Sequence, residues 1–282
     1  MFTSATQLKA WVKNKSNQTG IPANVILHSY MMERFLERLS LSQYRENIIL
    51  KGGLLIASMV GIENRSTMDM DTTIKGQSYN KDELRNLICE IIEIDAGDDV
   101  SFEIQNIKKI HDSGDYDDFR LSLIAFFHTI RVHMKLDLTA GDEIIPREIE
   151  YSYKLLFEDR TISIMAYNLY SILAEKIETI LSRNTSNTRA RDFYDVYILL
   201  TLNSRELSSE RILDVLNLKA IERGSIEYIE EHEKHLADIA ESEEIAKIWA
   251  AYCDNYHYAE GINMKDVISK ISRVFGDINK NQ

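Results

Sequence analysis

The hydrophobic pattern of this 282-residue chain changes its period near Pro146. Before that point, segments that alternate between apolar and polar side chains are interspersed with segments of helical period, whereas after it the pattern is helical almost to the end. Alternation is typical of a strand with one buried face, and a period near 3.6 is typical of an amphipathic helix. We therefore expect an α+β protein in which a mixed sheet with flanking helices occupies residues 1–150 and a helical domain occupies residues 151–282.

The first part should contain the strands. Two helices are expected in the N-terminal segment, and the second begins near Pro22. A short apolar strand should end at Lys51 and pass through a Gly52–Gly53 turn into a short helix closed by Gly61. Further strands are predicted at 68–76, 100–110, 119–129 and 130–141, with a helix at 80–94. From residue 161 onward the pattern predicts helices at 165–183, 189–202, 206–217, 225–239, 242–256 and 264–275.

Charge and composition narrow the functional classes. The chain has 33 Lys and Arg against 45 Asp and Glu, a formal net charge of −12. A protein that coats nucleic acid needs a broadly basic surface, so this chain would need a local basic groove to bind RNA.

Cys89 and Cys253 have the spacing of neither a metal site nor a disulfide framework, which indicates a reducing compartment. Without a signal-like segment or a run of about 18 apolar residues, we expect a soluble cytoplasmic protein that does not bind membranes.

Two carboxylates mark the stretch "RSTMDMD", residues 65–71. Residues two apart in a strand project to the same side, so Asp69 and Asp71 should share one face, with Thr67 in line before them. Two carboxylates so close together repel each other and destabilise the fold unless a cation lies between them. Such a pair is common as surface decoration, but it also suits a divalent cation.

A third carboxylate follows from the strand at 130–141. Its apolar face is formed by Val132, Met134, Leu136 and Leu138, and its polar face by Arg131, His133, Lys135 and Asp137. Asp137 on a strand next to Asp69 and Asp71 would complete a site for Mg²⁺ or Mn²⁺. Ions in such a cluster lower the pKa of an attacking hydroxyl and neutralise a triphosphate.

The sequence "KGG", residues 51–53, precedes this acid pair and strengthens the case for a nucleotide site. Gly52 and Gly53 let the backbone approach a ligand closely, and amide groups at the start of a helix favour phosphate. The order and spacing of the glycines and the acids are more specific than either feature alone.

A second group of charged residues lies in the helical part, in "LAEKIETILSRNTSNTRARDFYDVYIL", residues 173–199. Lys176 and Arg183 should lie on one helix face, and Arg191 and Asp192 begin the next helix. Ordinary surface pairing is one interpretation. The functional interpretation is a phosphate-binding Lys176 aided by Arg183 and Arg191, with Asp192 fixing either the lysine or the base and sugar of a nucleotide.

This block and the earlier stretch "ILKGGLLIASMVGIENRSTMDMDTTIKG", residues 49–76, together closely resemble the AbiEii/AbiGii family of nucleotidyltransferase toxins. Members of that family carry a K-G-G turn, an R-x-[ST]-x-D-[LM]-D strand and a later E-K…R…R-D-x-x-D-[LV]-Y block. Here these motifs occur in the family order over residues 49–200. The resemblance implies a polymerase-β-like nucleotidyltransferase core followed by a helical domain that completes the nucleotide site. It also implies the toxin of a type IV toxin–antitoxin pair acting in abortive infection, an antiviral defence.

The resemblance assigns roles to individual residues. The metal carboxylates of the family fall on Asp69 and Asp71, its lysine on Lys176, and its Arg-Asp pair on Arg191 and Asp192. Asp137 is assigned as the third acid, and as base for the acceptor hydroxyl, from its strand context.

This chain departs from the pattern at the first motif. The superfamily usually has Gly-Ser there, whereas this chain has Gly52-Gly53 followed by Leu54, where many members have Thr. Because no hydroxyl is available at that point, phosphates would rely on backbone amides, on Lys51 or Arg65, and on Lys176.

Thr67 occupies the Ser/Thr position of the family motif, next to Ser66. Phosphorylation of either hydroxyl would place negative charge beside the metal site and should block it.

The implied activity is transfer of a nucleoside monophosphate from an NTP to a hydroxyl acceptor, with Mg²⁺ and release of pyrophosphate. The implied acceptor is RNA, especially the tRNA 3′ end, and the implied partner is an AbiEi-like antitoxin encoded nearby, with or without a stable complex. Two alternatives remain open: transfer to a small molecule or protein, as AMPylators do, and a catalytically silent NTP-binding module.

Overall fold

The computed structural model describes residues 2–75, 79–111, 118–141 and 143–276. The chain forms two compact units. The sheet unit comprises Met1–Asp142 and Glu148–Tyr167, and the helical unit comprises Glu143–Arg147 and Asn168–Gln282. The sheet unit therefore extends past residue 150, where the sequence pattern placed the boundary.

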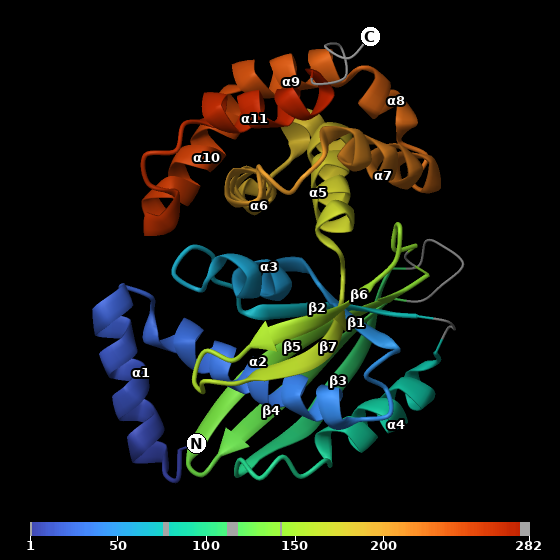
Figure 1. Cartoon of the computed structure of the whole chain (residues 1–282). Coiled ribbons are helices and arrows are strands. Elements are labelled where there is room, and N and C mark those ends of the chain that lie inside the picture. Colours follow the sequence, from blue (N-terminus) through green and yellow to red (C-terminus); the bar gives the residue numbers. More distant parts are fainter. Residues whose placement is uncertain (1, 76–78, 112–117, 142, 277–282) are drawn as a thin grey trace. The chain divides into compact units, whose positions relative to one another are not determined.

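A mixed sheet forms the centre of the sheet unit, in the strand order β3-β4-β5-β2-β1-β7-β6 (Figure 1). Its strands are β1 (Ile48–Lys51), β2 (Asp69–Ile74), β3 (Val100–His111), β4 (Asp118–Phe127), β5 (Ile130–Ala140), β6 (Ile149–Lys154) and β7 (Thr161–Ala166). Strands β2 and β5 run parallel, as do β1 and β7, and the other neighbours are antiparallel. The expected fold class, α+β with a mixed sheet and flanking helices, is confirmed.

Four helices belong to this unit: α1 (Ala5–Thr19), α2 (Ala23–Leu41), α3 (Gly52–Val60) and α4 (Lys81–Ile92). Helix α2 covers the apolar face of the sheet (Figure 1), where Tyr30 meets Phe127 and Phe35 meets Phe102 edge to face. The alternation predicted for β5 is present, because its apolar residues are buried and its polar residues face the other way. One sheet face is thus left for polar chemistry.

Three features of the sheet unit differ from the expectation. The first is strand β6 (Ile149–Lys154), where no strand was predicted. Residues Thr161–Ala166 form strand β7 and not the start of a helical region, because Ile162, Ile164 and Ala166 alternate inward between β1 and β6. The strand expected at 68–76 begins at Asp69, so Thr67 precedes it; its expected last residue, Gly76, lies outside the described residues.

The helical unit contains α5 (Leu169–Arg183), α6 (Ala190–Leu202), α7 (Ser209–Glu222), α8 (Ile226–Glu230), α9 (His232–Glu241), α10 (Glu243–Asn255) and α11 (Met264–Gly276). Helix α5 packs against both α6 and α7, and its apolar side is buried (Figure 1). The helix expected at 225–239 is interrupted at Glu231, whose backbone leaves the helical region without a Gly or Pro to signal the break. Among the described residues, no helix is long and apolar enough to cross a membrane.

Glu33 on α2 makes the stability of the sheet unit depend on pH. Its side chain is fully buried and accepts a hydrogen bond from the backbone N–H of Leu156 at 2.8 Å. Burial raises the pKa of Glu33 from 4.5 to about 8, while the Leu156 N–H and Arg34 act in the opposite direction. Between these two values the folded chain keeps a proton that the unfolded chain releases, so the free energy of unfolding should fall as pH rises from about 5 to about 8.

We expect Glu33→Gln to remove this component of the pH dependence, which amounts to roughly 4 kcal/mol. Urea unfolding at several pH values between 5 and 8.5 measures it, with Glu46→Gln at an exposed position as the matched control. Parallel pH profiles for the wild type and Glu33→Gln would contradict the assignment.

Candidate active site

A row of four charged residues crosses the polar face of the sheet. In register, Arg120 on β4 lies beside Asp137 on β5, Asp137 beside Asp71 on β2, and Asp71 beside Lys51 on β1. Register partners in a sheet project to the same side, so the row places two acids between two bases. The structure thus brings together Asp71 and Asp137 from strands far apart in the sequence.

Asp69 adds a third carboxylate to this face. It lies two residues before Asp71 on β2 and pairs in register with Lys135 on β5. Its side chain and those of Asp71 and Asp137 are all half-buried. The three acids therefore occupy adjacent positions on two parallel strands.

Gly52 allows helix α3 to begin directly against Asp71. Its φ is +66°, and a Cβ at this position would lie 2.2 Å from Asp71 Oδ2 and 2.8 Å from Asp71 Cβ. The next residue, Gly53, points its N–H at Asp71 Oδ2 across 3.4 Å. The predicted turn is thus the first turn of α3, and the acid accepts from the start of that helix.

Arg65 and Thr67 pack against the second glycine. A Cβ on Gly53 would lie 3.0 Å from both Arg65 Nη2 and Thr67 Oγ1. Arg65 is buried and donates to the carbonyl of Ser66, and the Thr67 hydroxyl lies 3.4 Å from both N and O of Asp69. In this structure both side chains brace the backbone that leads into β2.

Lys51 at the end of β1 reaches across the polar face. Its Nζ donates to Thr139 Oγ1 at 2.8 Å and lies 5.6 Å from the centre of the Tyr167 ring. Its charge is therefore held on the polar face, at the β1 end of the row.

Arg120 is the member of the row that the sequence analysis missed. Its Nε and Nη2 donate to the two oxygens of Asp137 at 2.7 and 2.6 Å. The hydrogen bond and charge of Asp137, with smaller contributions from Asp69 and Asp71, raise the pKa of Arg120 above its ordinary value. Arg120 and its partner Asp137 are 17 residues apart, so no local motif joins them. Only the alternation of apolar and polar residues along β4 could have indicated that Arg120 lies on the same sheet face as the acids.

In the helical unit, Lys176 on α5 lies between two acids of α6. Its Nζ is 2.5 Å from Asp192 Oδ1 and 3.0 Å from Asp195 Oδ2. Both carboxylates are buried, and Asp192 Oδ2 has no hydrogen-bond partner among the residues that the structure describes. Asp192 and Asp195 thus both pair with the lysine in this structure. Arg183 and Arg191 are exposed near these helix ends.

The donors on the sheet face suit Mg²⁺ or Mn²⁺ in chemistry, because all three are carboxylate oxygens. Within the described ranges, no three His, Cys, Asp or Glu side chains gather closely enough to hold a metal ion. Asp137 is turned to Arg120 and Asp71 to Gly53. A cation at Asp137 would therefore meet a carboxylate whose two oxygens both already accept from Arg120.

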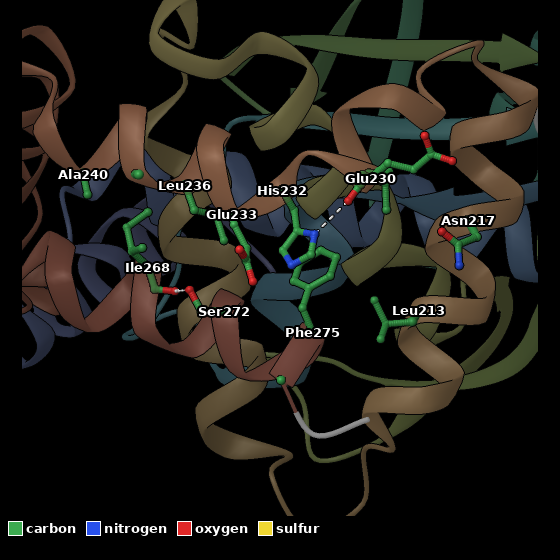
Figure 2. Close-up of a pocket in the computed structure, with 13 residues that line it drawn as sticks. Leu213, Asn217, Glu230, His232, Glu233, Leu236, Ala240, Ile268, Ser272 and Phe275 are labelled. Carbon is green, nitrogen blue, oxygen red and sulfur yellow. Dashed lines mark hydrogen bonds between the residues drawn. The ribbon is translucent and has the colours of Figure 1, made fainter. Parts of the chain in front are cut away.

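The large groove of the helical unit lies elsewhere. It measures about 610 Å³ between α7, α9 and α11, where the His232 ring stacks on Phe275 at 3.9 Å (Figure 2). None of the predicted site residues lines it. In the sheet unit, a cavity of about 250 Å³ lies beside Thr67, between α3 and the segment that follows β6.

Comparison with known proteins identifies the family of the chain. Residues 34–267 match the family model described as nucleotidyl transferase AbiEii toxin, type IV TA system. The chain belongs to this AbiEii toxin family. The suspected resemblance is thereby confirmed, and so is membership in a nucleotidyltransferase toxin family of type IV toxin–antitoxin systems.

Two crystal structures from Helicobacter pylori show the same fold as this AbiEii-family chain. One is a proposed nucleotidyltransferase, with a TM-score of 0.54 and 12% identity, covering 93% of this chain and 99% of that one. The other is JHP933, with a TM-score of 0.53 and 12% identity, covering 93% of this chain and 96% of that one. No curated protein matches the sequence significantly.

Proposed function

We propose that this AbiEii-family protein transfers a nucleoside monophosphate from an NTP to a hydroxyl of RNA, most specifically the tRNA 3′ end. One observation carries the proposal: Asp71 and Asp137 are neighbours on parallel strands, Asp69 shares their face, and Asp71 accepts from Gly53 at the start of α3. Carboxylates at adjacent strand positions beside a helix N-terminus suit a cation-bound triphosphate.

Each group on the sheet face has a proposed task. Mg²⁺ or Mn²⁺ held by the three acids would neutralise the triphosphate and lower the pKa of the acceptor hydroxyl. Asp137 takes the proton as the acceptor oxygen bonds to the α-phosphorus. The bond from that phosphorus to the oxygen bridging to the β-phosphate breaks, and pyrophosphate leaves with the electron pair. Lys51 and the Gly53 amide stabilise phosphate oxygens.

The family resemblance assigns further roles in this proposal to residues of the helical unit. Lys176 binds the triphosphate, and its two carboxylate partners keep its ammonium in one position. The buried Asp192 Oδ2 accepts a hydrogen bond from the sugar or base of the nucleotide, which would give it the partner it otherwise lacks among the described residues. Arg183 and Arg191 contribute exposed positive charge for an RNA backbone in an otherwise acidic chain.

The biological setting also belongs to the proposal. Modification of tRNA ends in the cytoplasm would block translation and inhibit growth, which is the outcome expected of abortive phage defence. The partner would be an AbiEi-like antitoxin.

Labelling with each α-³²P-NTP tests the acceptor. The protein is incubated with Mg²⁺, total RNA and cell protein, and Lys176→Ala is compared with the wild type. Label should enter RNA with the wild type and fall about a hundredfold or more with Lys176→Ala, because a charge stabilising the triphosphate is lost. Label in protein or a metabolite would favour the small-molecule or protein acceptor, and NTP binding without any label would favour the silent module.

A further inference from the structure

We propose that Arg120 is the internal counter-cation of Asp137: its guanidinium holds the third acid in the cation-free protein, and a divalent cation binds by displacing it. This inference rests on the proposed function, since it concerns the same acids. It assigns to Arg120 the task of setting the affinity for the ion.

The geometry of the pair favours exchange. Both Asp137 oxygens accept from Arg120, at 2.7 and 2.6 Å, in a two-pronged arrangement. A carboxylate held in this way cannot turn an oxygen towards Asp71 without losing at least one of these bonds. The guanidinium therefore competes directly with any cation for Asp137.

The surroundings make exchange feasible. The Arg120 side chain is 46% exposed, whereas the Asp137 side chain is 19% exposed, so the guanidinium can move into solvent while the acid stays in place. Arg120 also lies in the field of Asp69 and Asp71, both of which contribute to raising its pKa. Arg120 shares this face with other positive charges, Lys51 in register with Asp71 and Lys135 in register with Asp69. A doubly charged ion among the three acids would neutralise them more directly than these side chains do.

The order of the four charged residues across the sheet explains why Arg120, the counter-cation of Asp137, is on β4. Asp71 has Lys51 on its far side in register, whereas Asp137 has Asp71 on one side and Arg120 on the other. Two adjacent acids without Arg120 would repel each other in the free protein. Arg120 thus stabilises the pair of acids at the cost of weaker ion binding.

Isothermal titration of the full-length protein with MnCl₂, without nucleotide, tests the exchange. Arg120→Gln should lower the Kd for Mn²⁺ about tenfold, the range expected for removing a well-aligned but half-exposed competitor. Arg120→Lys, which keeps the charge but not the two-pronged geometry, should fall between the wild type and Arg120→Gln. Circular dichroism checks that each variant is folded.

A double-mutant cycle separates exchange from a general charge effect. In an Asp137→Asn background, Arg120→Gln should no longer tighten Mn²⁺ binding, because the competition runs through Asp137. Suppose that Asp69→Asn weakens Mn²⁺ binding but Arg120→Gln leaves the Kd for Mn²⁺ unchanged or raises it. The exchange is then overturned, whereas the metal site stands. If no variant, the wild type included, binds Mn²⁺, both the exchange and the metal-dependent part of the proposed function are overturned.

Discussion

Asp69→Asn is expected to reduce nucleotidyl transfer about a thousandfold or more, in a protein that remains folded. The substitution keeps the shape of the side chain but removes one of the three carboxylates on the polar sheet face. Repulsion from Asp71 also falls, so the free energy of unfolding should stay the same or rise slightly. Transfer of α-³²P label and urea unfolding measure the two effects on the same preparations.

Asp99→Asn provides the matched control. Asp99 is exposed, lies in the loop before β3 and has a φ of +56°, a conformation that Asn adopts as readily as Asp. The chemical change is identical, yet neither activity nor stability should move. An Asp69→Asn protein that transfers label at the wild-type rate would remove this residue from the active site.

Gly52→Ala is expected to abolish transfer and to destabilise the sheet unit by about 3 kcal/mol. The added Cβ would meet Asp71 Oδ2 at 2.2 Å, in a backbone conformation with φ of +66° that alanine disfavours. Either the start of α3 or the Asp71 side chain must move, and both belong to the proposed site. Thermal unfolding and label transfer measure the two consequences.

Gly20→Ala separates backbone strain from collision. Gly20 has a φ of +73°, close to that of Gly52, but an added Cβ there would have no neighbour within 4 Å. This variant should lose about 1 kcal/mol and keep its activity. If Gly52→Ala and Gly20→Ala lost equal amounts of stability and activity, contact with Asp71 would not be what constrains Gly52.

Much of the sheet unit could be predicted from local patterns. Period-two alternation identified β5 and its polar face, and the apolar run before Gly52 identified β1. Strand β7 was missed because "TISIMA" leads into α5 with only Asn168 and its neighbour Tyr167 between them, so its apolar residues merged with the helical pattern. A strand that pairs with both β1 and β6 depends on contacts distant in sequence.

The residues of the site could be predicted where a local pattern or the alternation of a strand marks them. Spacing placed Asp69 and Asp71 on one face, and strand context placed Asp137 nearby. Arg120 escaped notice because its role depends on the register between β4 and β5, which no local pattern reports. Likewise, the second partner of Lys176, Asp195, became visible only when α5 and α6 were packed together.

The central claim is that the acids of the sheet face serve transfer of a nucleoside monophosphate. The most direct measurement compares NTP labelled with ³²P at the α-position and at the γ-position, in parallel reactions with RNA and Mg²⁺. The account predicts that α-label enters the acceptor, that γ-label leaves as pyrophosphate in equal amount, and that Asp69→Asn stops both. Transfer of γ-label to the acceptor, or α-label transfer undiminished in Asp69→Asn, would contradict it.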